Sequence, residues 1–257
     1  MSATLRNLKV RPVEIIMLAA LLAGALWFFT WNNAFPFTLH ADEGKKVSYI
    51  MGNAPDFHHP LLLIQTGRLI QAVTDWSGPE GAALAGRWGS ALAGVLLLAG
   101  FYFWVRRTQG GLTAWIATAG LGMTPLVAVH AHYVKEDMML TAAIMGVALA
   151  LRRWRESDGR WILIALGVAL GLAAASHYKS VLLLGLMVWV ARERHEPMKL
   201  LSIFATAAVV FLAVNYTMVT HAVTFLSGAG TMFTNAVGGQ EVDTYPVPEF
   251  FTFHLFH

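Results

Sequence analysis

Residues 13–31 read VEIIMLAALLAGALWFFTW, an almost uninterrupted apolar run in which Glu14 is the one charged residue. About 20 such residues are what an α-helix needs to cross the hydrocarbon core of a bilayer. Basic residues precede the run, as in a signal peptide, but no small-x-small cleavage site follows it. We therefore expect a retained first transmembrane helix.

The composition of the whole chain agrees with a membrane protein. Of its 257 residues, 56% are hydrophobic and only 13% are charged, against about 25% charged in an average soluble domain. This excludes a soluble globular enzyme and a nucleic-acid-binding chain. The chain has no cysteine, which excludes disulfides, thiolate catalysis and cysteine-based zinc sites.

Six further apolar runs follow the first, at 88–105, 112–129, 138–151, 161–176, 181–191 and 200–220. Another opens at Phe250 near the end of the chain. In a bilayer only helices and closed barrels satisfy their own backbone. We expect an all-α, polytopic bundle of about seven spans with the start of an eighth, forming one domain over residues 1–257 with polar loops at 32–87 and 221–249.

Within the first of these loops, residues 60–75 are expected to form a juxtamembrane amphipathic helix. Leu62, Leu63, Leu69, Ile70 and Val73 fall on one side, with Arg68, Gln71 and Asp75 opposite. The polar residues favour a helix lying along the membrane surface over a span.

Basic residues predict the orientation. Twelve of the 18 lysines and arginines fall in one set of loops, which the positive-inside rule makes cytoplasmic together with the N-terminus: Arg6, Lys9, Arg11, Arg106, Arg107, Arg152, Arg153, Arg155, Arg160, Arg192, Arg194 and Lys199. Most of the acids and nine of the ten histidines fall on the opposite side. Any chemistry is therefore expected on the outer face.

The adjacent acids Asp42 and Glu43 follow the first span by about ten residues. Neighbouring carboxylates repel each other, which raises the pKa of one or both and makes a competent base. A solvated acidic turn is the plainer alternative.

His58 and His59 precede Pro60. They would cap the juxtamembrane helix or face a ligand phosphate. They are a weak signal for a metal site, because the rings of two neighbouring histidines diverge.

A second polar group lies at Glu136 and Asp137, where acids are favoured at a helix N-terminus by the helix dipole. A third is His177 and Lys179. The runs at 138–151, 161–176 and 181–191 are shorter than the roughly 30 Å core. If arginines pin their cytoplasmic ends, these polar residues lie recessed below the outer surface, where ionisable groups mark a substrate path. Lys179 would pair with a lipid phosphate or reach to the membrane interface.

The order and spacing of these pieces resemble the front half of a type-C membrane glycosyltransferase, the group containing protein O-mannosyltransferases and lipid A aminoarabinose transferases. The matching segments are 42–43, 56–62, 86–88, Pro125, 132–138, 176–180, and the Gly238-Gly239-Gln240 loop with Pro246 and Pro248. The end departs from the pattern, because family members continue through several more spans.

The resemblance implies transfer of a sugar from a polyprenyl-phosphate carrier to an acceptor hydroxyl on the outer face, with inversion. Asp42 would be the base and Glu43 its helper. Lys179 and Arg87 would bind the leaving phosphate, ahead of Lys45 or Lys46. Glu136 and Asp137 would orient the base, contact the sugar or hold a divalent cation. Some members of the group need such a metal and others do not. His58, His59 and His177 complete the expected substrate-binding set.

Two other functions compete with the transferase. The abrupt end at His257 favours a truncated, non-catalytic subunit packed against partner membrane proteins. A transporter using intramembrane carboxylates would show paired repeats and broken helices at mid-membrane, whereas here the charges gather at one face.

The expected location is a bacterial inner membrane. The expected partners are membrane lipid, the lipid-linked sugar donor and partner membrane subunits.

Overall fold

A computed structural model describes residues 11–34, 43–55, 57–157 and 159–238, apart from the side chains of 232, 233 and 235–238. The described chain is all-α, as expected. It divides into two compact units, one of residues 1–55 and 60–216 and the other of 56–59 and 217–257. The single domain over 1–257 stays a prediction.

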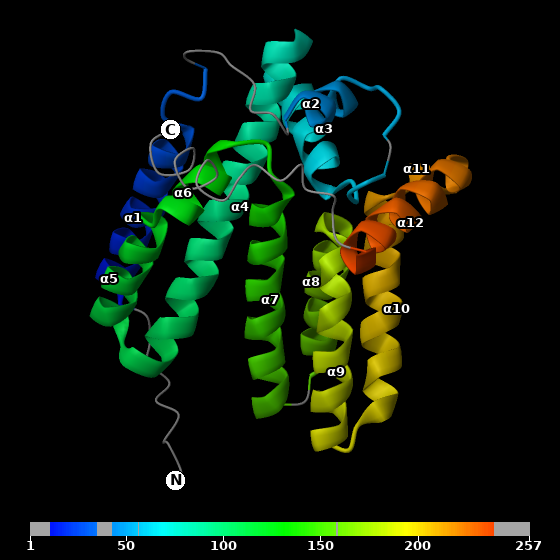
Figure 1. Ribbon diagram of the computed structural model, residues 1–257. Helices are drawn as coiled ribbons and strands as arrows, with labels where there is room; N and C mark the ends of the chain where they lie inside the picture. Colours follow the sequence, from blue (N-terminus) through cyan, green and yellow to red (C-terminus); the bar gives the residue numbers. More distant parts are fainter. Residues whose placement is uncertain (1–10, 35–42, 56, 158, 239–257) are drawn as a thin grey trace. The chain divides into compact units, whose positions relative to one another are not determined.

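The first unit holds ten of the twelve described helices and a short 3₁₀ turn (Figure 1). They are α1 (Pro12–Thr30), α2 (Glu43–Ile50), α3 (Leu62–Thr74), α4 (Gly78–Gln109), α5 (Gly111–Gly122), α6 (Pro125–His132), α7 (Glu136–Glu156), α8 (Arg160–Ser176), η1 (Tyr178–Val181), α9 (Leu182–Glu193) and α10 (Pro197–Val214). Helix α4 packs against α1, α3, α5 and α7, and α8 packs against α7 and α10. The second unit holds α11 (Thr217–Thr220) and α12 (Ala222–Gly238).

Three of the described helices, α1, α4 and α10, are long and apolar enough to cross a membrane. A fourth span results if α5 and α6, bent by 62° at a short break, count as one. The chain is an integral membrane protein with three or four such spans by length and composition, and the expected number of about seven is not shown.

The break between α5 and α6 interrupts what the sequence presents as one apolar run. Thr124, which precedes Pro125, has φ −65° and ψ 135°. A proline ring clashes with a helical residue before it and forces that residue into an extended conformation. The run at 112–129 is therefore two helices.

The run at 138–151 also differs from the expectation. Helix α7 has 21 residues, or about 31 Å at 1.5 Å per residue, but it is not among the described helices that are apolar enough to cross a membrane. Most of its extra length is the basic segment after Leu151, where Arg152 pairs with Glu156 one turn later. The apolar part of α7 is still the run at 138–151, so the recessed position of Glu136 and Asp137 stays a prediction.

The expected juxtamembrane helix forms as α3, but its apolar residues do not share one environment. Leu63, Ile64 and Gly67 are buried, whereas Leu69 and Val73 are exposed. Asn215, at the end of α10, fixes the start of α3: its Oδ1 accepts a hydrogen bond from the Leu61 amide at 2.8 Å, and its Nδ2 donates to the Phe211 carbonyl at 2.9 Å. That α3 lies along a membrane stays a prediction.

Helices α8 and α10 approach each other at two glycines one turn apart, Gly167 and Gly171. A Cβ built on Gly167 would lie 2.7 Å from the Ile203 carbonyl oxygen, and one on Gly171 would lie 2.7 Å from that of Ala207. Small residues four apart allow such backbone contact between membrane helices, where packing replaces the hydrophobic effect.

Gly171→Ala is expected to lower the free energy of unfolding by about 1–3 kcal/mol, because the new methyl group meets backbone that cannot move aside. Gly185→Ala in α9 is the matched control, since nothing lies within 4 Å of its Cβ position. Denaturation in mixed micelles measures both. Equal stability of the two variants would contradict close backbone packing at Gly171.

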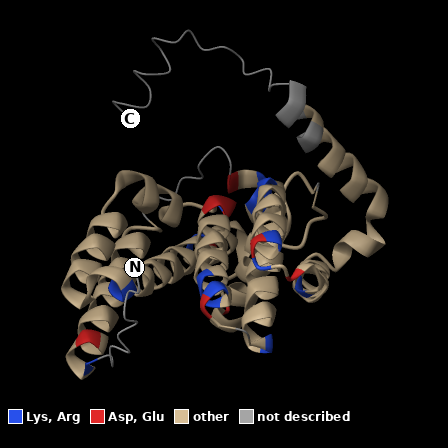
Figure 2. Ribbon diagram, turned by 90° about the horizontal axis from the view of Figure 1, so that it is seen from below, with Lys and Arg blue, Asp and Glu red and all other residues tan. Residues whose placement is uncertain are grey.

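Basic residues gather with acidic partners at one end of the first unit, at the ends of α4, α7 and α9. Figure 2 shows that lysines, arginines and acids occupy a few short segments of otherwise uncharged helices. Arg106 pairs with Glu14 at 2.7 Å, Arg107 with Glu156 at 2.5 Å, and Arg155 with Glu193 at 2.5 Å. The positive-inside prediction thus corresponds to one end of the fold, although its compartment is not shown.

Glu196, in the turn between α9 and α10, accepts hydrogen bonds from Arg194 and Lys199. These hydrogen bonds lower the pKa of Glu196 to about 2, and the bond from Arg194 has the larger effect. A carboxyl whose folded pKa is depressed adds stability above its unfolded pKa, and that stability is lost as the pH falls toward the folded value. The turn is thus stabilised at neutral pH.

Candidate functional site

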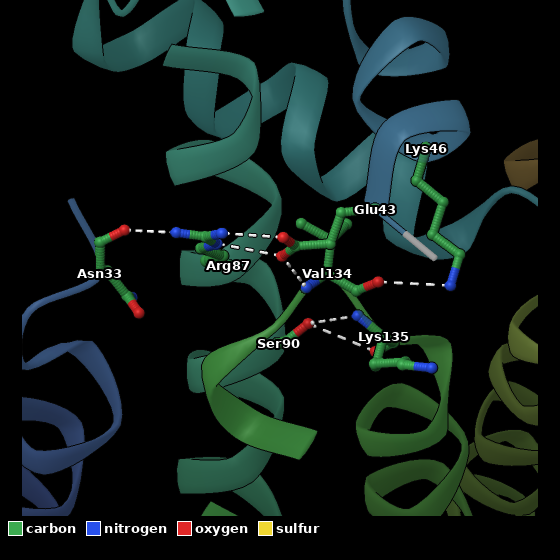
Figure 3. Close-up of polar contacts among 7 residues, drawn as sticks. All are labelled: Asn33, Glu43, Lys46, Arg87, Ser90, Val134 and Lys135. Atoms are coloured by element: carbon green, nitrogen blue, oxygen red, sulfur yellow. Dashed lines mark hydrogen bonds and ion pairs between the residues drawn. The ribbon is translucent and has the colours of Figure 1, made fainter. Parts of the chain in front are cut away.

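The most buried charged group among the described residues is the ion pair of Glu43 and Arg87, which are 0% and 3% exposed. Arg87 Nε donates to Glu43 Oε1 at 3.0 Å, and Nη2 donates to Oε2 at 2.7 Å (Figure 3). This two-bond geometry is the strong form of an arginine–carboxylate contact. It connects the first residue of α2 to the N-terminal third of α4.

Backbone groups from two further segments complete the coordination. The Val134 amide, between α6 and α7, donates to Glu43 Oε1 at 2.9 Å, and Arg87 Nη1 donates to the Asn33 carbonyl after α1. A buried ion pair repays its desolvation only when such additional hydrogen bonds are made. Four segments of the first unit therefore meet at this pair.

Gly86 is what allows α4 to come this close. A Cβ on Gly86 would lie 2.8 Å from Val134 and 3.0 Å from Ile50. A side chain there would have to displace the Val134 and Ile50 side chains, which pack against this face of α4. The Gly86-Arg87 order thus has a packing reason.

A second layer of polar contacts surrounds the pair. Lys46 Nζ donates to the Val134 carbonyl at 3.2 Å and forms an ion pair with Glu136, the first residue of α7. The Ser90 hydroxyl, one turn after Gly86, exchanges hydrogen bonds with the Lys135 backbone at 3.2 and 3.3 Å. Glu136 is 6% exposed, so α2, α4 and the start of α7 form one polar network.

His177 and Lys179 lie where α8 ends and η1 begins. His177 is 6% exposed, and its Nδ1 accepts a hydrogen bond from the Lys179 amide at 3.1 Å. A neutral imidazole that accepts at Nδ1 carries its proton on Nε2. The Lys179 side chain is exposed, and in the described part of the chain no acid forms an ion pair with it.

The other expected site residues are less constrained. Asp137 is half-buried in the first turn of α7. His58 and His59 are half-buried members of the second unit and follow Phe57, whose φ of 55° is unusual for a bulky side chain. Phe57 packs edge-to-face on Phe225 of α12, with ring centroids 5.7 Å apart. Asp42 lies outside the described residues.

Sequence reasoning paired Glu43 with Asp42 and assigned Arg87 to a phosphate. The structure brings Glu43 and Arg87 to each other instead. It also adds Asn33, Ser90 and the Val134 amide, which the sequence argument missed. The spacing of Gly86, Ser90 and Gly94 by four residues was the available signal, since small residues one turn apart mark a helix face that another backbone approaches.

The chain matches a known protein family over more than half of its length. The family model described as dolichyl-phosphate-mannose-protein mannosyltransferase matches residues 66–223. The chain belongs to this family. Arg87, Ser90, Glu136, His177 and Lys179 lie inside the matched region, whereas Asp42 and Glu43 precede it.

A solved structure has the same fold. It is that of the S. cerevisiae protein O-mannosyltransferase Pmt1-Pmt2 complex bound to the sugar donor, which matches with a TM-score of 0.64 at 18% identity. The match covers 90% of this chain and 35% of that chain. The present chain therefore spans about a third of the length of the matched yeast chain. A search of curated proteins gave no match.

Proposed function

We propose that the chain is a membrane glycosyltransferase that moves a sugar from a polyprenyl-phosphate donor to an acceptor hydroxyl on the outer face, with inversion. Family membership supports the reaction class. The observation that carries the site is the buried Glu43–Arg87 pair, because it fixes the residue that directly follows Asp42 in the sequence. A base must be held within hydrogen-bond reach of the proton it removes.

In the proposed reaction Asp42 takes the proton of the acceptor hydroxyl. The acceptor oxygen forms a bond to the anomeric carbon from the face opposite the phosphate. The bond between that carbon and the phosphate oxygen breaks, and the phosphate leaves with the electron pair. Atoms and charge balance, with polyprenyl phosphate and the glycosylated acceptor as products.

The contacts refine the roles of the cations. Arg87 is engaged by Glu43, so we propose that it positions the base segment. The exposed Lys179 is the better candidate to stabilise the leaving phosphate, as such charge requires. His58, His59, His177 and Asp137 remain proposed substrate contacts, and Glu136 acts through Lys46 or, with Asp137, holds a divalent cation.

The direct test is a transfer assay in membranes that contain the chain, with a radiolabelled polyprenyl-phosphate sugar and hydroxyl acceptors. Label should move from the lipid phase to the acceptor, and NMR of the product should show an inverted anomeric centre. Retained configuration would exclude single displacement. No transfer, even with the natural membrane partners present, would exclude the enzyme.

A second candidate is a non-catalytic subunit of a membrane complex. The matched structure is itself a membrane complex, which favours this candidate. Copurification in fixed stoichiometry, together with full function of an Asp42→Asn variant, would support the subunit over the enzyme.

The proposed orientation is also testable, because the chain has no cysteine. We expect Ser77→Cys, in the turn before α4, to react with a membrane-impermeant maleimide in intact cells. Ser157→Cys, in the basic turn after α7, should react only after permeabilisation, since the positive-inside rule places it in the cytoplasm. Both positions are exposed. The reverse labelling pattern would place the proposed site on the wrong face.

A further inference from the structure

A shallow, open cleft of about 480 Å³ is lined by α3, by Met51 just after α2, and by the turn into α4. Arg68, Gln71, Ala72 and Asp75 line it. Their spacing of three, four and seven residues puts them on one face of α3. The exposed apolar side chains Leu69 and Val73 fall on a different face, so the polar stripe is separate from the surface expected to meet lipid.

Trp76, the residue after this stripe, also lines the cleft. The turn that presents it has two left-handed residues, Asp75 at φ 54° and Gly78 at φ 71°. A Cβ on Gly81 would lie 2.7 Å from the Trp76 backbone, so this glycine lets the turn lie against α4. The indole also packs on Trp88, with ring centroids 6.3 Å apart. The aromatic wall is thus fixed by its surroundings.

Polar groups around the cleft have unused hydrogen-bonding capacity. Arg68 is anchored to the Tyr49 carbonyl through Nε at 3.1 Å and Nη2 at 2.6 Å. Within the described part of the chain, its Nη1 group and the side chains of Gln71 and Asp75 make no hydrogen bond, nor does the Trp76 indole. Donors and acceptors of both kinds therefore face one space beside a flat aromatic ring.

The charges restrict what can bind. The negative charge of Asp75 repels a phosphate or a carboxylate, and the positive charge of Arg68 repels a cation. A flat apolar face with donors and acceptors at its rim suits a ligand that has one apolar face and many hydroxyl groups. We propose that the cleft binds a neutral saccharide and that, given the proposed transfer reaction, this saccharide is part of the acceptor.

The position of the cleft fits that role. Met51, at the end of α2, lines it, and Glu43 begins the same helix. Eight residues of α2 span about 12 Å at 1.5 Å per residue. An acceptor held in the cleft could therefore extend toward the base segment while its distal sugar stays bound.

Binding is measured without donor, so its outcome does not depend on transfer. The wild-type chain in phosphatidylcholine nanodiscs is titrated with maltose, cellobiose and mannobiose, using saturation-transfer NMR and calorimetry. We expect at least one disaccharide to bind. Trp76→Leu and Asp75→Asn should each weaken it about tenfold or more, as lost contacts to a charged or aromatic partner do.

Asn suits the left-handed backbone at position 75, so Asp75→Asn tests the carboxylate without straining the turn. Glu80→Gln removes the same charge at an exposed position outside the cleft and should leave affinity unchanged. In the transfer assay the two cleft variants should raise KM for a saccharide acceptor and leave kcat nearly unchanged. If no disaccharide binds, or if the cleft variants bind as the wild type does, the proposal is wrong while the transferase proposal stands.

Discussion

Replacing Glu43 with glutamine is expected to lower the free energy of unfolding by about 3–5 kcal/mol, because it leaves the Arg87 guanidinium buried without its counter-charge. Glutamine matches the shape of glutamate, and its carbonyl oxygen can still accept the Val134 amide hydrogen. The variant therefore removes the charge and also replaces the acceptor Oε2 with an amide donor that faces Arg87 Nη2. Denaturation of the purified chain in mixed micelles, or the yield of folded protein, measures it.

Two companion variants make this result specific. Glu80→Gln removes one negative charge at an exposed position and should stay within about 0.5 kcal/mol of the wild type. Adding Arg87→Met to Glu43→Gln removes both buried charges and should recover part of the loss, because no buried charge is then left without its partner. If the double variant is as unstable as the sum of its parts, the two residues do not interact.

Asp42→Asn should reduce the transfer rate by about 10² to 10⁴-fold, the usual effect of removing a general base. Asparagine keeps the size and hydrogen-bonding shape of aspartate but cannot take a proton. Protein level and unfolding midpoint should stay near wild type. The rate is measured in the transfer assay, normalised to folded protein, with any required partner subunit supplied.

The Asp42 and Glu43 variants thus separate two kinds of loss. As the helper of the base, Glu43 would on the sequence argument lower the transfer rate less than Asp42 when it is substituted. Its buried ion pair with Arg87 instead predicts that Glu43→Gln mainly lowers stability. Glu80→Gln again serves as the control and should transfer normally. Full activity of Asp42→Asn would remove the base assignment, and an equal fall in its stability would indicate a structural carboxylate.

Much of the fold could be predicted from the sequence because it depends on local patterns. The apolar runs correspond to α1, α4, α10 and the shorter helices between them, and the amphipathic stretch at 60–75 corresponds to α3. Pro125 carried the signal for the bend between α5 and α6, which the length of the apolar run concealed. The ends of α7 could not be found from hydropathy, because paired charges extend a helix beyond its apolar part.

The composition and the order of apolar runs determined by themselves that this protein is helical and lies in a membrane. Each helix satisfies its own backbone, so its position follows from residues near one another in the chain. The partner of Glu43 was decided only by the tertiary structure. Arg87 is 44 residues away and the Val134 amide 91 residues away, and no periodicity relates such positions. Their meeting depends on how closely α2, α4 and α7 approach, which Gly86 permits. A charge pattern shows where ionisable groups lie along the chain, and packing decides which of them are neutralised and which stay available for chemistry.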